Sequence, residues 1–106
     1  MGNKNLFSGL PESLDHEYFS ELISAPNTRI ERIVSKGQTS PPTGWYDQTE
    51  NEWVLVLQGA GTITFESGGD VTLRPGDYIN IPAGQKHKVS WTDPNQLTVW
   101  LAVFYS

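Results

Sequence analysis

The chain of 106 residues contains no cysteine. Disulfide bonds, zinc sites built on thiolates and catalysis by a thiol nucleophile are therefore excluded. A chain without disulfides suits a reducing compartment, so we expect a cytoplasmic location.

Positive charge is also scarce. Lysine and arginine number 7 against 12 acidic residues, which gives a formal charge of −5, and the basic residues form no run. Nucleic acids and anionic membrane surfaces are therefore poor candidates as partners. Long apolar runs are missing too, since a segment such as Trp53–Leu57 is far too short to cross a bilayer. The first residues also lack the apolar core of a signal peptide.

What is present is typical of a globular protein, with 37% hydrophobic and 18% charged residues. The length favours one domain. Within it we expect an N-terminal arm with a short helix over residues 1–27 and a β-domain over residues 28–106. The helix is predicted from apolar residues at helical spacing, with Asp15 as its N-cap and Ala25-Pro26-Asn27 as its end. Those apolar residues are Leu14, Tyr18, Leu22 and Ile23.

Short β-branched or alternating segments, separated by turns rich in glycine and proline, make up most of the remaining chain. They predict strands at Ile30–Ser35, Trp53–Leu57, Thr62–Glu66, Val71–Leu73, Tyr78–Ile81, His87–Thr92 and Leu97–Tyr105. Short strands with turns every eight to twelve residues indicate an all-β sandwich or barrel.

The last predicted strand, Leu97–Tyr105, is apolar on both faces, so both faces should be covered. Two covers are compatible with each other. One is the N-terminal helix, and the other is a second copy of the chain in a homodimer.

Four residues near the middle of the β-domain have a characteristic spacing. Gly76, Pro82, Gly84 and His87 follow the pattern G-x5-P-x-G-x2-H, which resembles the second motif of the cupin superfamily. The resemblance covers roughly residues 28–105. It implies a cupin fold, the double-stranded β-helix or jelly-roll barrel, which agrees with the strand pattern.

The first cupin motif is only half present. Glu52, followed by six residues and a glycine, resembles the end of that motif. Cupins usually carry H-x-H three or four residues before this glutamate. Those positions hold Tyr46 and Gln48 in one register, and Trp45 and Asp47 in the other, so neither register contains histidine.

The resemblance implies a metal site reduced to Glu52 and His87, with Gln48 or Asp47 as a further oxygen ligand. If residues 45–48 are extended, Tyr46 and Gln48 project to one face, which favours Gln48 as the third ligand. One carbonyl, one carboxylate and one imidazole suit a divalent first-row metal such as Mn²⁺, Fe²⁺ or Zn²⁺. Tyr46 would then be a proton donor or a substrate contact. The alternative is a buried hydrogen-bond network of the same three residues with no metal.

A pocket is expected beside this site. His87, Val89 and Trp91 share one face by the two-residue period of a strand, and Trp45 and Asp47 precede the glutamate. We therefore expect Trp45, Asp47, Val89 and Trp91 to line the pocket.

Three functions remain open. One is a metal-dependent enzyme (a dioxygenase, isomerase or lyase) that acts on a small organic molecule. Another is a small-molecule binding or sensing module without turnover or metal. The third is a metal-free hydrolase or isomerase in which Glu52 is the general base. The fold by itself does not choose among them.

Overall fold

The computed structural model describes residues 2–106 and contains eight β-strands and no helix in that range. The strands are β1 (Tyr18–Ala25), β2 (Thr28–Ser35), β3 (Asn51–Gln58), β4 (Gly61–Phe65), β5 (Asp70–Leu73), β6 (Tyr78–Ile81), β7 (His87–Thr92) and β8 (Thr98–Tyr105). The all-β prediction is confirmed. Nothing in the described part of the chain is a helix long and apolar enough to span a membrane.

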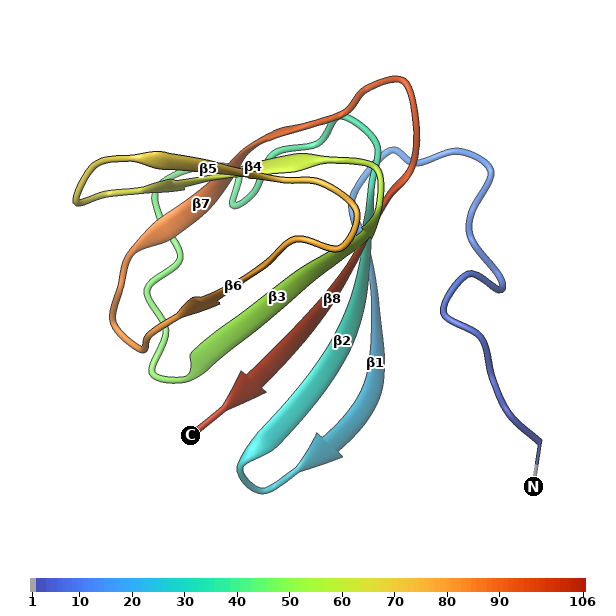
Figure 1. Cartoon of the computed structure of the whole chain (residues 1–106), viewed down its shortest axis with the longest axis horizontal. Helices are drawn as coiled ribbons and strands as arrows, with labels where there is room; N and C mark the ends of the chain where they lie inside the picture. Colours follow the sequence, from blue (N-terminus) through green and yellow to red (C-terminus); the bar gives the residue numbers. More distant parts are fainter. Residues whose placement is uncertain (1) are drawn as a thin grey trace.

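The strands form two antiparallel sheets that face each other (Figure 1). The larger sheet has the order β1-β2-β8-β3-β6, and the smaller has the order β5-β4-β7. Non-consecutive neighbours such as β2 and β8 show that the chain crosses between the sheets, as in a jelly roll.

The hydrophobic core lies between the sheets. Alternation along β8 turns Trp100, Ala102 and Phe104 inward, and all three are at most 6% exposed. They pack with the buried aliphatic side chains of the other strands, which are Val54, Val56, Ile63, Leu73 and Ile81.

The predicted N-terminal helix is wrong. Tyr18–Ala25 is strand β1, and Pro26 and Asn27 form the hairpin turn to β2 rather than the end of a helix. The apolar spacing misled because Leu22 and Ile23 do not face the core: they are 44% and 53% exposed, beside a bulge between Glu21 and Ile23. Pairing of the backbone with the edge of β2 decides the conformation here, which side-chain spacing does not reveal.

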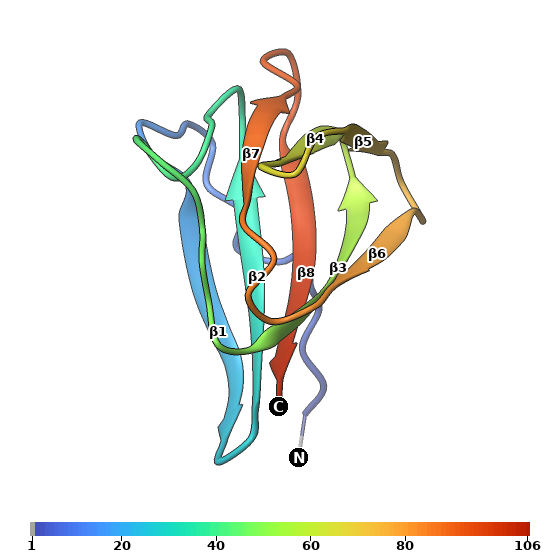
Figure 2. The same cartoon turned by 90° about the vertical axis from the view of Figure 1, so that its left-hand side faces the viewer.

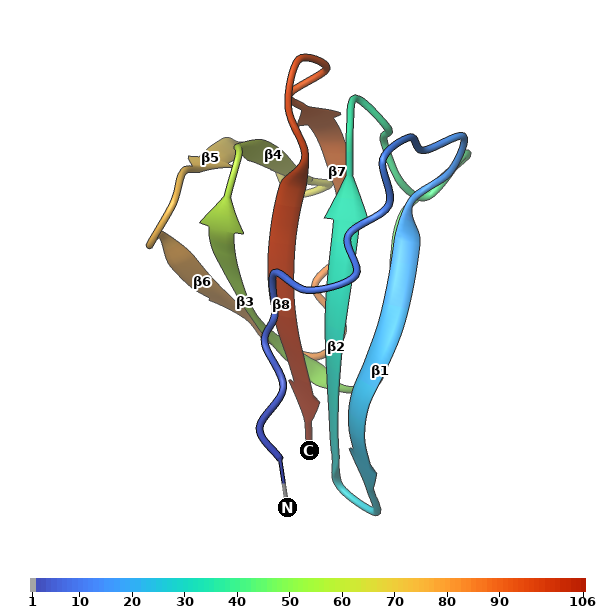
Figure 3. The ribbon, with the colours of Figure 1, turned by 90° about the vertical axis from the view of Figure 1, so that its right-hand side faces the viewer.

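The outer face of β8 is crossed by the N-terminal arm, which runs over β8 and β2 without forming a helix (Figure 3). Arg32 of β2 fixes the arm, since its Nη1 donates hydrogen bonds to the carbonyls of Leu6 (2.9 Å) and Ser8 (2.7 Å). The outward residues Leu101 and Val103 remain half-buried. The arm therefore provides part of the cover expected from a helix.

The spacing from Glu52 to Gly59 has a structural reason. Glu52 faces the interior from the start of β3, and Gly59 forms the turn into β4 with a φ of 84°. A Cβ at this position would lie 2.6 Å from the Cα of Thr98. The strand thus begins at the site and ends at a turn that admits only glycine.

Candidate functional site

His87, the first residue of β7, is 3% exposed and is held from both sides along its backbone. On one side β7 pairs with β4. On the other, Tyr46 donates its N–H to the His87 carbonyl (2.7 Å) and accepts the His87 N–H (3.1 Å). The connection from β2 to β3 therefore runs beside β7 before it enters β3 (Figure 2). This connection brings Tyr46 and Gln48 to the site.

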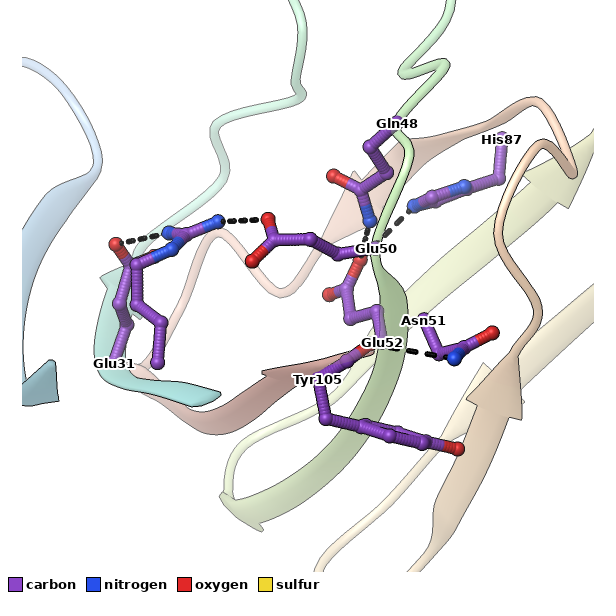
Figure 4. A network of polar contacts seen from close by, with 8 residues as sticks. Glu31, Gln48, Glu50, Asn51, Glu52, His87 and Tyr105 are labelled. Atoms are coloured by element: carbon purple, nitrogen blue, oxygen red, sulfur yellow. Dashed lines mark hydrogen bonds and ion pairs between the residues drawn. The ribbon is translucent and has the colours of Figure 1, made fainter. Parts of the chain in front are cut away.

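Three predicted ligands meet in one polar network (Figure 4). The Nε2 of His87 lies 3.2 Å from the Oε1 of Glu52, and the Gln48 amide donates to the same oxygen at 2.9 Å. Glu52 enters from β3, His87 from β7, and Gln48 from the connection before β3. Residues separated by up to 39 positions therefore lie together, as the resemblance to the cupin motifs implies.

The arrangement of protons on His87 follows from its partners. Its Nδ1 lies 2.9 Å from the carbonyl oxygen of Gln85, which only accepts, so Nδ1 carries a proton. A neutral imidazole then presents a lone pair on Nε2 to the Glu52 carboxylate, and two acceptors face each other. A proton or another cation between them removes this conflict.

The pKa of His87 reflects the same geometry. Burial alone would lower the pKa of His87, but the hydrogen bond to Glu52, the carbonyl of Gln85 and the charge of Glu52 together raise it above its ordinary value. The pair thus favours the imidazolium form.

Tyr46 lies against His87, with 5.6 Å between the ring centroids. Burial raises the pKa of Tyr46; the neighbouring Ser40 opposes this shift, and the charges of Glu17, Glu52 and Glu31 add to it. The phenol therefore stays protonated at neutral pH and acts as a hydrogen-bond donor rather than a base.

The network opens into a cavity of about 220 Å³ between the two sheets. Its wall includes Tyr46, Gln48, Glu52 and His87 and is otherwise mainly aliphatic and aromatic. The other lining residues are Glu17, Phe19, Arg29, Glu31, Ile33, Ser40, Val54, Ile63, Val89, Trp100 and Phe104.

Three charged lining residues were missed from the sequence: Glu17, Arg29 and Glu31. Arg29 and Glu31 alternate with the outward residues of β2 and so face the cavity with Ile33. The sequence did contain a signal for them: Arg29 and Glu31 share one face of this strand with the apolar Ile33, which indicates charged side chains on the inner face. Glu17 directly precedes β1. The sequence analysis placed this segment in a helix, so it did not predict that Glu17 faces the cavity.

Of the four residues expected to line the pocket, one lies in the cavity wall and three do not. Val89 lines the cavity, but Trp45, Asp47 and Trp91 do not. Trp45 stacks under the Lys88 ammonium at 4.5 Å, and Asp47 is exposed. Trp91 is 43% exposed because a bulge in β7 pairs Val89 with Ile63 but Trp91 with Thr62, so the two-residue period is broken at Ser90.

As a metal centre, the donor set is incomplete. No group of three or more His, Cys, Asp or Glu side chains within residues 2–106 has the geometry to hold a metal. His87 and Glu52 supply two donors, and the bond from Nδ1 to a carbonyl orients Nε2 as in metal sites. The amide oxygen of Gln48 would have to provide the third. Glu52, His87 and Gln48 are therefore the residues that would hold a divalent ion.

Comparison with known proteins identifies the architecture. The family described as "Cupin domain" matches residues 31–104, which is most of the chain. The chain is a cupin. A provisionally assigned mannose-6-phosphate isomerase from Ralstonia eutropha JMP134 is 41% identical over 100% of this chain and 99% of its own, with a TM-score of 0.93.

Two further structures share the fold of this cupin. A cupin superfamily protein from Desulfitobacterium hafniense DCB-2 is 18% identical, with a TM-score of 0.75 over 91% of this chain and 83% of its own. The EutQ protein of Clostridium difficile is 23% identical, with a TM-score of 0.69 over 84% of this chain and 67% of its own. No curated protein matches this cupin.

Proposed function

We propose that this cupin binds a small organic molecule in its cavity and transfers a proton to or from it with the Glu52–His87 pair. The observation that carries the proposal is the 3.2 Å contact between Nε2 of His87 and Oε1 of Glu52 at the wall of the cavity. A carboxylate and an imidazolium held together provide a base and an acid in one place.

The chemistry that this pair suits is proton transfer next to a carbonyl group. Glu52 would remove a proton from the carbon beside the carbonyl, and the electron pair of that C–H bond would form the enol. His87 would donate its Nε2 proton to the carbonyl oxygen, and Tyr46, a neutral donor, would orient that oxygen. Where the first carbon carries a hydroxyl group, the intermediate is an enediol. Glu52 would return its proton to the former carbonyl carbon, and the hydroxyl of the first carbon would give its proton to the neutral His87 and become the new carbonyl, which completes an isomerisation.

Exchange of substrate protons tests this proposal. A panel of small hydroxy-ketones is incubated with the protein in deuterated water, and loss of the proton signal beside the carbonyl is followed by NMR. We expect exchange with wild type and loss of exchange in Glu52→Gln. Asp47→Asn, an exposed acid outside the cavity wall, is the matched control and should retain it. Binding without exchange would instead support the binding or sensing module.

A divalent metal is the finer form of the same proposal. His87 Nε2 and Glu52 would hold it, with the Gln48 oxygen as third donor after rotation of the amide. When bound, it would supply a Lewis acid for a substrate oxygen, as expected for a dioxygenase, isomerase or lyase. Calorimetric titration of Mn²⁺, Fe²⁺ and Zn²⁺ checks this: His87→Ala should weaken binding more than Gln48→Ala, and Gln48→His should strengthen it. If wild type shows no saturable heat, the metal form of the proposal is wrong and the Glu52–His87 pair acts without a metal.

The assignment of the Ralstonia relative favours sugar phosphate isomerisation as a second candidate. That reaction also moves a proton between neighbouring carbons. However, the cavity offers a phosphate one guanidinium, Arg29, whose Nη1 and Nη2 already bind Glu31 (2.7 Å) and Glu50 (2.8 Å). An assay with mannose 6-phosphate decides this: turnover would support the second candidate.

Homodimer formation is proposed from the outer face of the larger sheet. Trp53 and Leu55 of β3 pair with Val103 and Leu101 of β8, and Tyr78, opposite Leu55, is 64% exposed. Such an apolar face suits a second copy of the chain. A cytoplasmic location is proposed from the lack of cysteine, and cell fractionation tests it.

A further inference from the structure

The cavity has an unusual balance of charge for a space of its size. Three carboxylates line it, from Glu17, Glu31 and Glu52, against the guanidinium of Arg29 and the imidazole of His87. Burial raises the pKa of the Tyr46 phenol in the same wall, and the charges of all three carboxylates add to this shift. Negative charge therefore converges on the interior of the cavity.

The guanidinium does not offset this charge for a ligand. Arg29 donates one nitrogen to Glu31 and another to Glu50, and its flat face lies 4.0 Å from the ring centroid of Phe104. Two carboxylates thus neutralise its charge, and the Phe104 ring covers one face. An anionic ligand would have to compete with these two carboxylates for the positive charge.

The carboxylates, by contrast, keep capacity to accept hydrogen bonds. Glu17 uses Oε2 for the Ser35 hydroxyl, Glu31 uses Oε2 for Arg29, and Glu52 uses Oε1 for Gln48 and His87. Within residues 2–106 no hydrogen bond reaches the second oxygen of any of the three. Each has lone pairs left for a donor.

His87 leaves one oxygen of Glu52 open to a ligand. Its side chain is 3% exposed, with Nδ1 at the Gln85 carbonyl and Nε2 at Oε1 of Glu52. Because His87 and Gln48 both contact Oε1, the second oxygen of Glu52 has no hydrogen-bond partner within residues 2–106. A ligand that brings N–H groups and positive charge would donate to that oxygen.

The remaining wall specifies the body of the ligand. Ile33, Val54, Ile63 and Val89 are aliphatic, and Trp100 adds an indole. An apolar cavity of about 150 Å³ holds benzene, so about 220 Å³ admits a six-membered ring with a short substituent. Aromatic faces beside carboxylates also attract cations.

We propose that the ligand of this cavity is a small organic cation, a protonated amine on a compact apolar body, and not an anion such as a sugar phosphate. This inference rests on the proposed function, since it names the class of molecule that the same cavity would bind. The ammonium group lies among Glu17, Glu31 and Glu52, and the apolar body lies against the core side chains.

Three probes of one shape test the inference: benzylamine, benzyl alcohol and benzoate, which are cationic, neutral and anionic at neutral pH. Affinities are measured by NMR titration at fixed ionic strength. We expect benzylamine to bind at least about tenfold more tightly than benzyl alcohol, and benzoate more weakly than both.

Two variants and a control locate the effect. Glu17→Gln keeps an acceptor for the Ser35 hydroxyl but removes a negative charge. The affinity for benzylamine should therefore fall about tenfold, while the affinity for benzyl alcohol should not change. Glu31→Gln removes one of the two carboxylates that bind Arg29, so the affinity for benzoate should rise. Glu66→Gln makes the same change of charge at an exposed acid outside the cavity and should alter nothing.

The outcomes separate the two proposals. If benzoate or benzyl alcohol binds wild type as tightly as benzylamine, the cation inference is wrong, while binding of small molecules stands. The inference is also overturned if Glu17→Gln and Glu66→Gln weaken benzylamine equally. If none of the probes binds, the inference fails together with the binding that the proposed function needs.

Discussion

Replacement of His87 by alanine should destabilise the protein in a way that depends on pH. The substitution removes the partner of Glu52, whose side chain is 12% exposed, and leaves the Gln85 carbonyl without its donor. Stranding such a group costs about 1–3 kcal/mol. Lost packing of the ring against Tyr46 and Phe65 brings the expected loss to about 2–4 kcal/mol.

The dependence on pH follows from the raised pKa of His87 in the folded state. The folded protein holds the proton more tightly than the unfolded chain, so the contribution is complete below the ordinary value of 6.5. It is lost as the pH rises through the raised pKa. The free energy of unfolding of wild type should therefore fall above pH 6.5, by up to about 1.4 kcal/mol per pH unit.

Urea denaturation from about pH 5.5 to about pH 9 measures this effect. His87→Ala should lack the decline, and Glu52→Gln should lack most of it because the amide carries no negative charge to stabilise an imidazolium. His16→Ala, at an exposed histidine, is the control and should follow wild type. If wild type shows no decline, or if His87→Ala retains it, the coupling inferred from the 3.2 Å contact is wrong.

Three other expectations follow from the fold. Gly61→Ala should lower the free energy of unfolding by at least about 2 kcal/mol, because a Cβ there would overlap the ring of Trp100. Chemical denaturation checks this, and a neutral effect would contradict the close packing. Leu101→Asp on the outer face should convert a dimer to a species near 11.8 kDa by light scattering, and a wild-type mass already at that value would refute the dimer. Far-UV circular dichroism should show a β-spectrum without a helical component, and clear helical minima would contradict the strand β1.

The sequence predicted the parts of the fold that local chemistry controls. Strands β6 and β7 begin and end where glycine and proline turns placed them. The resemblance to the two cupin motifs also predicted that Glu52 and His87 lie close together, because each motif sets where its residue stands in the barrel. Turn residues mark the ends of strands, and a motif marks the place of its residues in the fold, so both can be recognised in a short stretch of sequence.

The remaining features depend on partners that are distant in sequence. The strand β1 forms because the edge of β2 offers hydrogen bonds, although the apolar spacing favours a helix. Trp91 turns outward because of one extra residue in the pairing of β7 with β4, and no residue type marks that bulge. The charged wall from Arg29 and Glu31 becomes visible only once the inner face of β2 is known.

The missing histidines of the first motif change the chemistry of the site more than its shape. Tyr46 still contacts His87, and Gln48 still contacts Glu52, so both positions where the family usually has histidine face the same point. What they now offer is a phenol O–H and an amide N–H in place of imidazole lone pairs. Where a metal ligand is usual in the family, the Gln48 amide donates a hydrogen bond to Glu52. The same replacement leaves the cavity rich in acceptors and poor in positive charge, which favours a proton or an organic cation at its centre.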